Sequence, residues 1–292
     1  MLKRVRRQWK KNKGSRGDNQ ALCPQGRELF FIKMDDMARM YFLDPHPAGH
    51  PAVLLLHGLG ANSSSWTLQL PPLIEAGFRP IAPDAPGFSR SPYDGKGWSV
   101  ATVAHSMADL LAELQTGPAH IVGISMGGVI AQQMAFGVPQ WIRKLVLVNT
   151  FTALRLESLG SWFYLLGRFV MVHTLGLPAQ AKVVARRIFA LVEQEELRRM
   201  LITTITQSDP RAYRAAMRAL ALFDSRKRLA EVRIPTLVIT GDRDTTVPPP
   251  RQELLVEGIS GARQVVIPNA GHAVSVEQAE AFNQELLAFL KE

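Results

Sequence analysis

The stretch that most constrains the fold is residues 120–128, His-Ile-Val-Gly-Ile-Ser-Met-Gly-Gly, which runs into a helical pattern at residues 129–135. It begins as an apolar strand and turns at Ser125, so one serine stands at the apex of a sharp strand-to-helix turn. Such a turn requires small residues two positions either side of the serine, because a Cβ there would collide with the facing backbone. Gly123 and Gly127 occupy these positions. The pattern predicts a hydroxyl group raised above the edge of a sheet.

The G-x-S-x-G spacing between a strand and a helix is typical of a nucleophile elbow. The N–H of Met126, at the helix start, is expected to point toward an atom that reacts with Ser125. A second donor, the N–H of Leu59, is expected from the loop His57-Gly58-Leu59-Gly60, which follows the apolar run 52–56. Leu59 and Met126 are therefore the candidate donors of an oxyanion hole. The alternative for residues 57–60 is a plain glycine-rich turn. The alternative for residues 123–128 is a helix start that only closes the connection between a strand and a helix.

The order of apolar runs along the chain predicts an α/β fold. An edge hairpin is expected at residues 28–34 and 39–43. Continuous apolar runs, typical of strands buried on both faces of a parallel sheet, follow at 52–56, 79–83, 120–124, 142–149, 235–241 and 263–267. Helical segments separate most of these runs. We therefore expect a mostly parallel, eight-stranded sheet with helices on both faces.

Residues 151–222 interrupt this alternation with about four helical segments and no clear strand. Inserted helices of this kind usually cover the C-terminal edge of the strands, where the site of an α/β sheet opens. The predicted organisation is a core of residues 21–150 and 223–292 with a helical cap at 151–222. The aromatic and methionine side chains of the cap predict an apolar cavity beneath it, or packing of cap against core.

Two arginine pairs in the predicted cap have two interpretations. Arg186-Arg187 and Arg198-Arg199 could meet an acidic group of a substrate, or they could lie on a solvated helix face.

The net charge of +9 is concentrated in a basic tail. Residues 1–20 carry eight Lys/Arg and one acidic residue, which leaves +2 for the other 272 residues. The charges of these 272 residues are nearly balanced, so the sequence shows no basic patch of the kind that binds nucleic acids. We expect the tail to be a solvated, disordered arm. The alternative is a basic amphipathic turn, with Leu2, Val5 and Trp9 on one side, through which residues 1–16 make weak contact with an anionic membrane surface.

Other features of the composition are those of a cytoplasmic protein. No apolar run reaches the ~18 residues that a membrane span needs, and no hydrophobic stretch near the N-terminus resembles a secretory signal. The single cysteine, Cys23, excludes an intramolecular disulfide and fits a reducing compartment. Nothing in the sequence indicates an oligomeric state.

Chemistry-bearing side chains follow three of the predicted strands. They are Ser125, the pair Asp242 and Asp244, and His272, and the C-terminal ends of parallel strands meet at one sheet edge. A serine hydroxyl is a weak nucleophile until an imidazole accepts its proton, and a carboxylate must orient that imidazole. The chain order Ser, Asp, His is one of the known orders of this triad. The sequence therefore predicts a nucleophilic serine site, with either aspartate as its acid.

Five segments together resemble the α/β-hydrolase fold superfamily, over about residues 28–292. They are HGLG (57–60), DAPGFSRS (84–91), GISMGG (123–128), GDRDTTVP (241–248) and NAGH (269–272). The resemblance implies that Asp244 is the acid and that Asp242 structures its loop. Some relatives carry the acid after the preceding strand, where this chain has Asn149, which favours Asp244. Dehalogenases and epoxide hydrolases of this fold use an elbow aspartate, so Ser125 argues against both.

The resemblance implies a serine hydrolase that cleaves a carboxylic ester or lactone through an acyl-enzyme. The GISMGG elbow is similar to that of enol-lactonases and small-ester hydrolases. A small-molecule substrate with an apolar part is expected, with no metal and no organic cofactor. The same triad serves C–C bond hydrolysis of a vinylogous diketone and a cofactor-free perhydrolase side activity. A non-catalytic ligand-binding or scaffold protein on the same fold is the non-enzymatic alternative.

Overall fold

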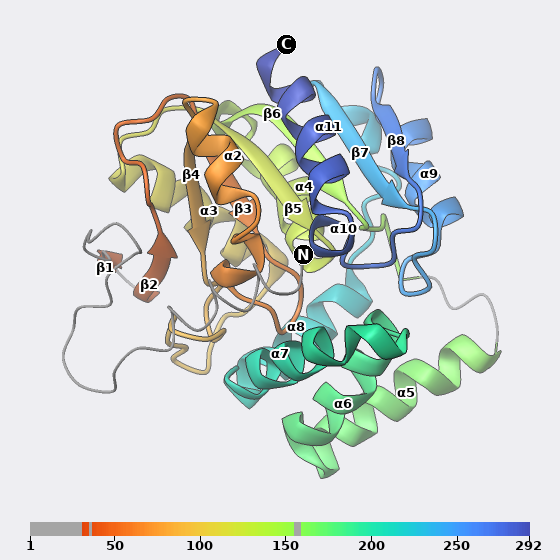
Figure 1. The fold of residues 1–292 in the computed structure, drawn as a ribbon. Helices are drawn as coiled ribbons and strands as arrows, with labels where there is room; N and C mark the ends of the chain where they lie inside the picture. Colours follow the sequence, from red (N-terminus) through yellow and green to blue (C-terminus); the bar gives the residue numbers. More distant parts are fainter. Residues whose placement is uncertain (1–30, 35–36, 155–158) are drawn as a thin grey trace.

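The computed structural model describes residues 31–34, 37–154 and 159–292, so the basic tail and Cys23 lie outside the described residues. Its centre is an eight-stranded sheet with the strand order β1-β2-β4-β3-β5-β6-β7-β8 (Figure 1). The strands are β1 (Phe31–Met34), β2 (Met37–Leu43), β3 (Ala52–Leu56), β4 (Arg79–Pro83), β5 (Ala119–Ile124), β6 (Ile142–Val148), β7 (Thr236–Gly241) and β8 (Arg263–Ile267). The β1–β2 and β2–β4 pairs are antiparallel and all other pairs are parallel. The predicted mostly parallel sheet is confirmed.

Alternate residues of the central strands supply two separate cores. In β3, Leu54 and Leu56 belong to the core under α3 (Val100–Glu113), α4 (Met126–Gly137) and α9 (Pro249–Gly258). Val53 and Leu55 belong to the core on the opposite face, under α2 (Leu70–Glu75), α10 (Val274–Glu277) and α11 (Ala279–Lys291). Because successive strand residues point to opposite faces, a strand covered on both sides must be apolar throughout, as β3 is.

Two helical segments are each divided in the structure. Residues 62–75 form a 3₁₀ turn, η1 (Ser63–Trp66), followed by α2, whose first turn contains Pro71. Proline lacks an N–H and is tolerated in the first turn of a helix, so α2 begins there. At the C-terminus, α10 and α11 are separated at Gln278, whose backbone (φ −129°, ψ 52°) is not helical.

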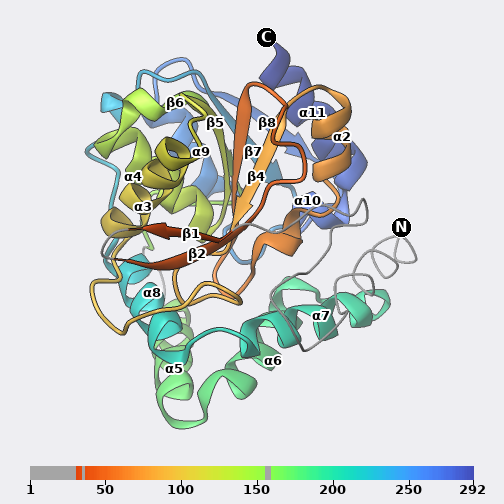
Figure 2. The ribbon, with the colours of Figure 1, turned by 90° about the vertical axis from the view of Figure 1, so that its left-hand side faces the viewer.

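Four helices cover the C-terminal ends of the parallel strands (Figures 1 and 2). They are α5 (Leu159–Thr174), α6 (Gly176–Ile188), α7 (Glu195–Thr206) and α8 (Pro210–Leu222), and we call them the cap. Arg187 Nη2 on α6 donates to the Thr245 carbonyl in the loop after β7, at 2.7 Å. Gln194 Nε2, between α6 and α7, donates to Glu277 Oε1 at the end of α10, also at 2.7 Å. Among the described helices, none combines the length and the apolar character needed to cross a bilayer.

His120, in the strand that leads to Ser125, is a buried histidine without a hydrogen-bond partner for Nδ1 among the described residues. Burial, with Arg143 and Lys144 nearby, lowers the pKa of His120 to about 4. An unfolded histidine has a pKa near 6.5. Between about pH 6.5 and pH 4, the unfolded chain therefore binds a proton at His120 that the folded chain does not bind. The stability that His120 contributes is complete above this window and is lost within it.

Replacement of His120 by phenylalanine is expected to remove this part of the acid sensitivity. The ring of Phe78 packs edge-on against His120 with centroids 5.8 Å apart, and phenylalanine keeps a ring there that cannot bind a proton. Between pH 7 and pH 4 the wild type is expected to lose up to about 3 kcal/mol more unfolding free energy than His120→Phe. Urea unfolding of both proteins across this range measures the difference. Parallel stability–pH curves would contradict the expectation.

Candidate active site

The turn at Ser125 is tight and sterically closed. Ser125 has φ 54° and ψ −114° and directly precedes α4. A Cβ on Gly123 would overlap the carbonyl oxygen of Gly127, and a Cβ on Gly127 would overlap that of Leu56. Thr150 Oγ1 donates to the Ser125 carbonyl at 2.8 Å and holds the turn from β6. With this geometry, any residue with a Cβ in place of either glycine would clash with the facing backbone.

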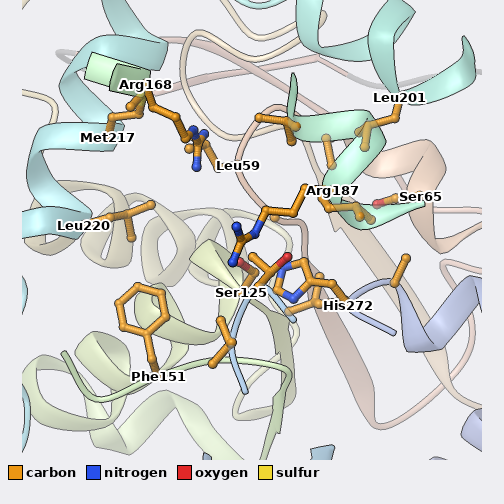
Figure 3. A pocket seen from close by; sticks show the side chains of 18 of the residues that line it. Leu59, Ser65, Ser125, Phe151, Arg168, Arg187, Leu201, Met217, Leu220 and His272 are labelled. Carbon is orange, nitrogen blue, oxygen red and sulfur yellow. The ribbon is translucent and has the colours of Figure 1, made fainter. Parts of the chain in front are cut away.

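The two candidate oxyanion donors belong to two segments next to Ser125, the start of α4 and the loop after β3. Met126 is the first residue of α4, so its N–H is among those that a helix N-terminus leaves without a partner in the helix. The β3 loop passes close by, since a Cβ on Gly58 would lie 3.6 Å from the Cβ of Ser125. Leu59, the next residue, lines the same cavity as Ser125 (Figure 3). Leu59 and Met126 therefore remain the candidate donors of an oxyanion hole.

His57 holds the β3 loop in place. Its buried ring bonds the Gly58 carbonyl through Nδ1 at 2.8 Å and accepts the Ala85 N–H at Nε2, at 2.9 Å. Nε2 can accept only if the ring is neutral. Burial lowers the pKa of His57 and so favours this neutral form, against the opposing effect of Asp84. The sequence alone does not distinguish His57 from a catalytic histidine. In the structure, both of its ring nitrogens are bonded to backbone groups, which indicates a structural role.

His272 is bonded to Asp244. The distance from His272 Nδ1 to Asp244 Oδ2 is 2.8 Å, and both residues are buried. The other carboxylate oxygen, Oδ1, accepts the N–H groups of Thr246 and Val247 at 2.8 and 2.9 Å. The bond between His272 and Asp244 uses Nδ1, so Nε2 is the ring nitrogen left for the cavity, which Ser125 and His272 both line (Figure 3).

Asp242 makes a different contact. Its Oδ1 accepts the Ala270 N–H at 3.1 Å and so joins the loop after β7 to the loop after β8. The structure thus brings Asp244, rather than Asp242, to His272.

Asn149 and Gln252 hold the three strand ends together and were not predicted as site residues. The Asn149 amide accepts the Gly241 N–H at 2.8 Å and donates to the carbonyls of Gly271 and His272, each at 2.9 Å. Gln252 donates to the Val247 carbonyl at 2.8 Å and lies 3.3 Å from Asn149 Oδ1. This buried network links the ends of β6, β7 and β8, which fixes the position of His272 relative to Asp244.

A cavity of about 840 Å³ lies between the cap and the strand ends. Ser125 and His272 line it, together with apolar side chains that include Leu59, Phe151, Leu201, Met217 and Leu220 (Figure 3). The volume is within the range of small-molecule sites. The apolar cavity predicted under the cap is therefore present.

The arginine pairs of the cap divide between the two interpretations given for them. Arg198 and Arg199 form ion pairs with Glu195 of their own helix, at 2.7 and 3.1 Å. On α6, Arg186 and Arg187 are both exposed, but only Arg187 is part of the cavity lining. Helical spacing is the signal for this, because Arg187 follows the cavity-lining Val184 by three positions.

The fold and the strand-end site define an α/β hydrolase. The model of the alpha/beta hydrolase family matches residues 53–285, and the chain belongs to this family. It is 32% identical over 255 residues to the putative carbamate hydrolase RutD of Variovorax paradoxus, covering 84% of this chain and 93% of that protein. It is 29% identical to the 2-hydroxy-6-oxo-6-phenylhexa-2,4-dienoate hydrolase of Comamonas testosteroni, covering 82% and 88% of the two chains. The crystal structure of the enol-lactonase of Burkholderia xenovorans superposes with a TM-score of 0.79 at 27% identity, covering 87% and 97%.

Proposed function

We propose that this protein is a serine hydrolase that cleaves a carboxylic ester or lactone through an acyl-enzyme intermediate. The observation that carries the proposal is the 2.8 Å contact between His272 Nδ1 and Asp244 Oδ2, in a cavity that both His272 and Ser125 line (Figure 3). An alcohol, an imidazole and a carboxylate in this order are the parts of a nucleophilic triad. Membership of a hydrolase family supports the same assignment.

In the proposed reaction the Ser125 oxygen attacks the substrate carbonyl carbon while His272 Nε2 accepts the hydroxyl proton. Asp244 keeps the proton of Nδ1 on the far side of the ring and stabilises the imidazolium. The N–H groups of Leu59 and Met126 bind the oxyanion of the tetrahedral intermediate. His272 then gives its proton to the leaving alcohol. Water, deprotonated by His272, hydrolyses the acyl-enzyme and restores the serine.

The ester or lactone class is supported by the likeness to an enol-lactonase structure and by the GISMGG elbow. Two relatives are named as a carbamate hydrolase and as a dienoate hydrolase. Cleavage of carbamates and of C–C bonds must therefore be compared with cleavage of esters and lactones. The test is a set of initial rates on 4-nitrophenyl esters, lactones, carbamates and vinylogous diketones. We expect the highest kcat/KM on an ester or a lactone. Faster cleavage of a diketone or a carbamate than of every ester and lactone would reassign the substrate class.

A fluorophosphonate probe separates a catalyst from a scaffold on the same fold. An activated Ser125 attacks the phosphorus and displaces fluoride, and the expected result is one stable adduct per chain, mapped to the peptide that contains Ser125. Heat-denatured protein is the control and should stay unlabelled. A native protein that forms no adduct would favour a non-catalytic ligand-binding role.

A further inference from the structure

One half-buried carboxylate next to the site has no part in the proposed reaction. It belongs to Glu277, which is the last residue of α10 and follows His272 by five positions. Its side chain returns to the loop that carries the histidine, since a Cβ added to Gly271 would lie 3.0 Å from Glu277 Oε2 and 3.1 Å from Oε1. The carboxylate therefore lies against the residue that directly precedes His272.

Gln194 holds this carboxylate from the cap. It is the last residue of η3 (Val192–Gln194), a 3₁₀ turn between α6 and α7. Gln194 Oε1 accepts the Leu191 N–H at 3.1 Å, and Gln194 Nε2 donates to Glu277 Oε1 at 2.7 Å. Because the amide oxygen bonds the cap backbone, the NH₂ group is the end that faces Glu277. In both overall views α10 lies on the side of the core that faces α7 (Figures 1 and 2).

The other carboxylate oxygen, Glu277 Oε2, is buried and has no hydrogen-bond partner among the described residues. Burial raises the pKa of Glu277, while Gln194, two neighbouring backbone groups and His272 act in the opposite direction. Of these neighbours, only His272 can carry a charge. A partly buried carboxylate with so few partners costs stability. A neutral glutamine could accept the same bond from Gln194, so this hydrogen bond alone does not require a charge.

We propose that Glu277 is a positioning residue that acts through His272. Its negative charge stabilises the protonated imidazole that forms when Ser125 loses its proton, and Gln194 keeps the carboxylate beside the histidine loop. Asp244 bonds Nδ1 directly, whereas Glu277 acts on the same positive charge through space. This inference rests on the proposed function and adds to the same site a residue that is not among the described cavity-lining residues.

The test compares pH profiles of kcat/KM for a 4-nitrophenyl ester between about pH 5 and pH 8.5. Glu277→Gln keeps the size of the side chain and the acceptor for Gln194 but removes the charge. A nearby negative charge favours the protonated imidazole, so we expect the acidic limb of the profile to move to lower pH by about half a unit or more. The imidazole becomes a weaker base, so kcat on the plateau should fall about 3- to 10-fold, with KM within about threefold.

Three further variants separate charge from shape. Glu277→Asp keeps the charge on a shorter side chain, so its acidic limb should stay close to that of the wild type. Gln194→Lys places an ammonium group against an unchanged Glu277 and an unchanged histidine loop, and it should move the limb as Glu277→Gln does. Glu280→Gln removes an exposed charge three positions further along the chain and should leave the profile unchanged.

The outcomes separate this inference from the proposed function. An acidic limb at the wild-type pH in both Glu277→Gln and Gln194→Lys would overturn the inference and leave the triad standing. Equal shifts in Glu277→Asp and Glu277→Gln would also overturn it, because shape and not charge would then be responsible.

A wild type that hydrolyses no ester would count against the proposed function. In that case an NMR titration of the His272 imidazole, with its signal assigned by comparison with His272→Gln, still decides the inference. The inference requires a titration midpoint at lower pH in Glu277→Gln than in the wild type. Equal midpoints in the two proteins would overturn it.

Discussion

Ser125→Ala is expected to lower kcat on the preferred ester by at least about 10⁴-fold. The reason is chemical: alanine has no oxygen to attack the carbonyl, so no acyl-enzyme forms and only binding and oxyanion stabilisation remain. The fold should be unaffected, because alanine keeps the Cβ that Ser125 already carries at φ 54°, and the strain of the turn is therefore unchanged. Steady-state rates and the thermal unfolding midpoint measure the two effects separately.

A matched control for Ser125→Ala is available in the same cavity. Ser65 also lines it, and its Oγ donates to the Asn62 carbonyl at 2.7 Å, away from the triad. Ser65→Ala should keep kcat within about tenfold of the wild type. A Ser125→Ala protein with more than about a tenth of the wild-type kcat would remove Ser125 from the mechanism.

Asp244→Asn is expected to lower kcat by about 10⁴-fold, which is the effect of this replacement in a serine-protease triad. Asp244 Oδ1 already accepts two N–H groups, from Thr246 and Val247. The asparagine oxygen is held by these donors, so its NH₂ group faces His272 Nδ1. The ring must then carry its proton on Nε2, where the Ser125 proton has to be accepted, and it is the wrong tautomer for a base.

Asp242→Asn is the control for this replacement, because it makes the same chemical change two residues away. Asp242 Oδ1 accepts the Ala270 N–H, and an amide oxygen can accept that bond equally well. Its kcat should stay within about tenfold of the wild type. Equal losses in the two variants, measured on the same ester, would mean that Asp244 has no special role.

The parts of the site that could be predicted from the sequence are those that local geometry dictates. Gly123, Ser125 and Gly127 form one tight turn, so their spacing alone indicates it, and strand ends of a parallel sheet meet at one edge. The choice of Asp244 over Asp242 came from resemblance to a family rather than from spacing. The structure supplies its physical reason, since only Asp244 reaches the His272 ring.

The remaining features depend on tertiary position and leave little local signal. Asn149 and Gln252 lie 103 positions apart in the chain and meet only because β6 and β7 are neighbours. The break at Gln278 comes inside a continuous apolar periodicity, and helical spacing does not reveal it. The helical spacing from Val184 to Arg187 becomes informative only once the folded cap shows that Val184 lines the cavity.

The most direct test of the triad is the detection of the acyl-enzyme itself. Wild-type protein mixed with excess 4-nitrophenyl ester is quenched in acid at millisecond times, and its intact mass and peptide map are measured. We expect a burst of one equivalent of 4-nitrophenol and one acyl group per chain on the peptide that contains Ser125, both absent from Ser125→Ala. Sustained turnover with no acylated peptide under any quench time, or an acyl group on another residue, would contradict nucleophilic catalysis by Ser125.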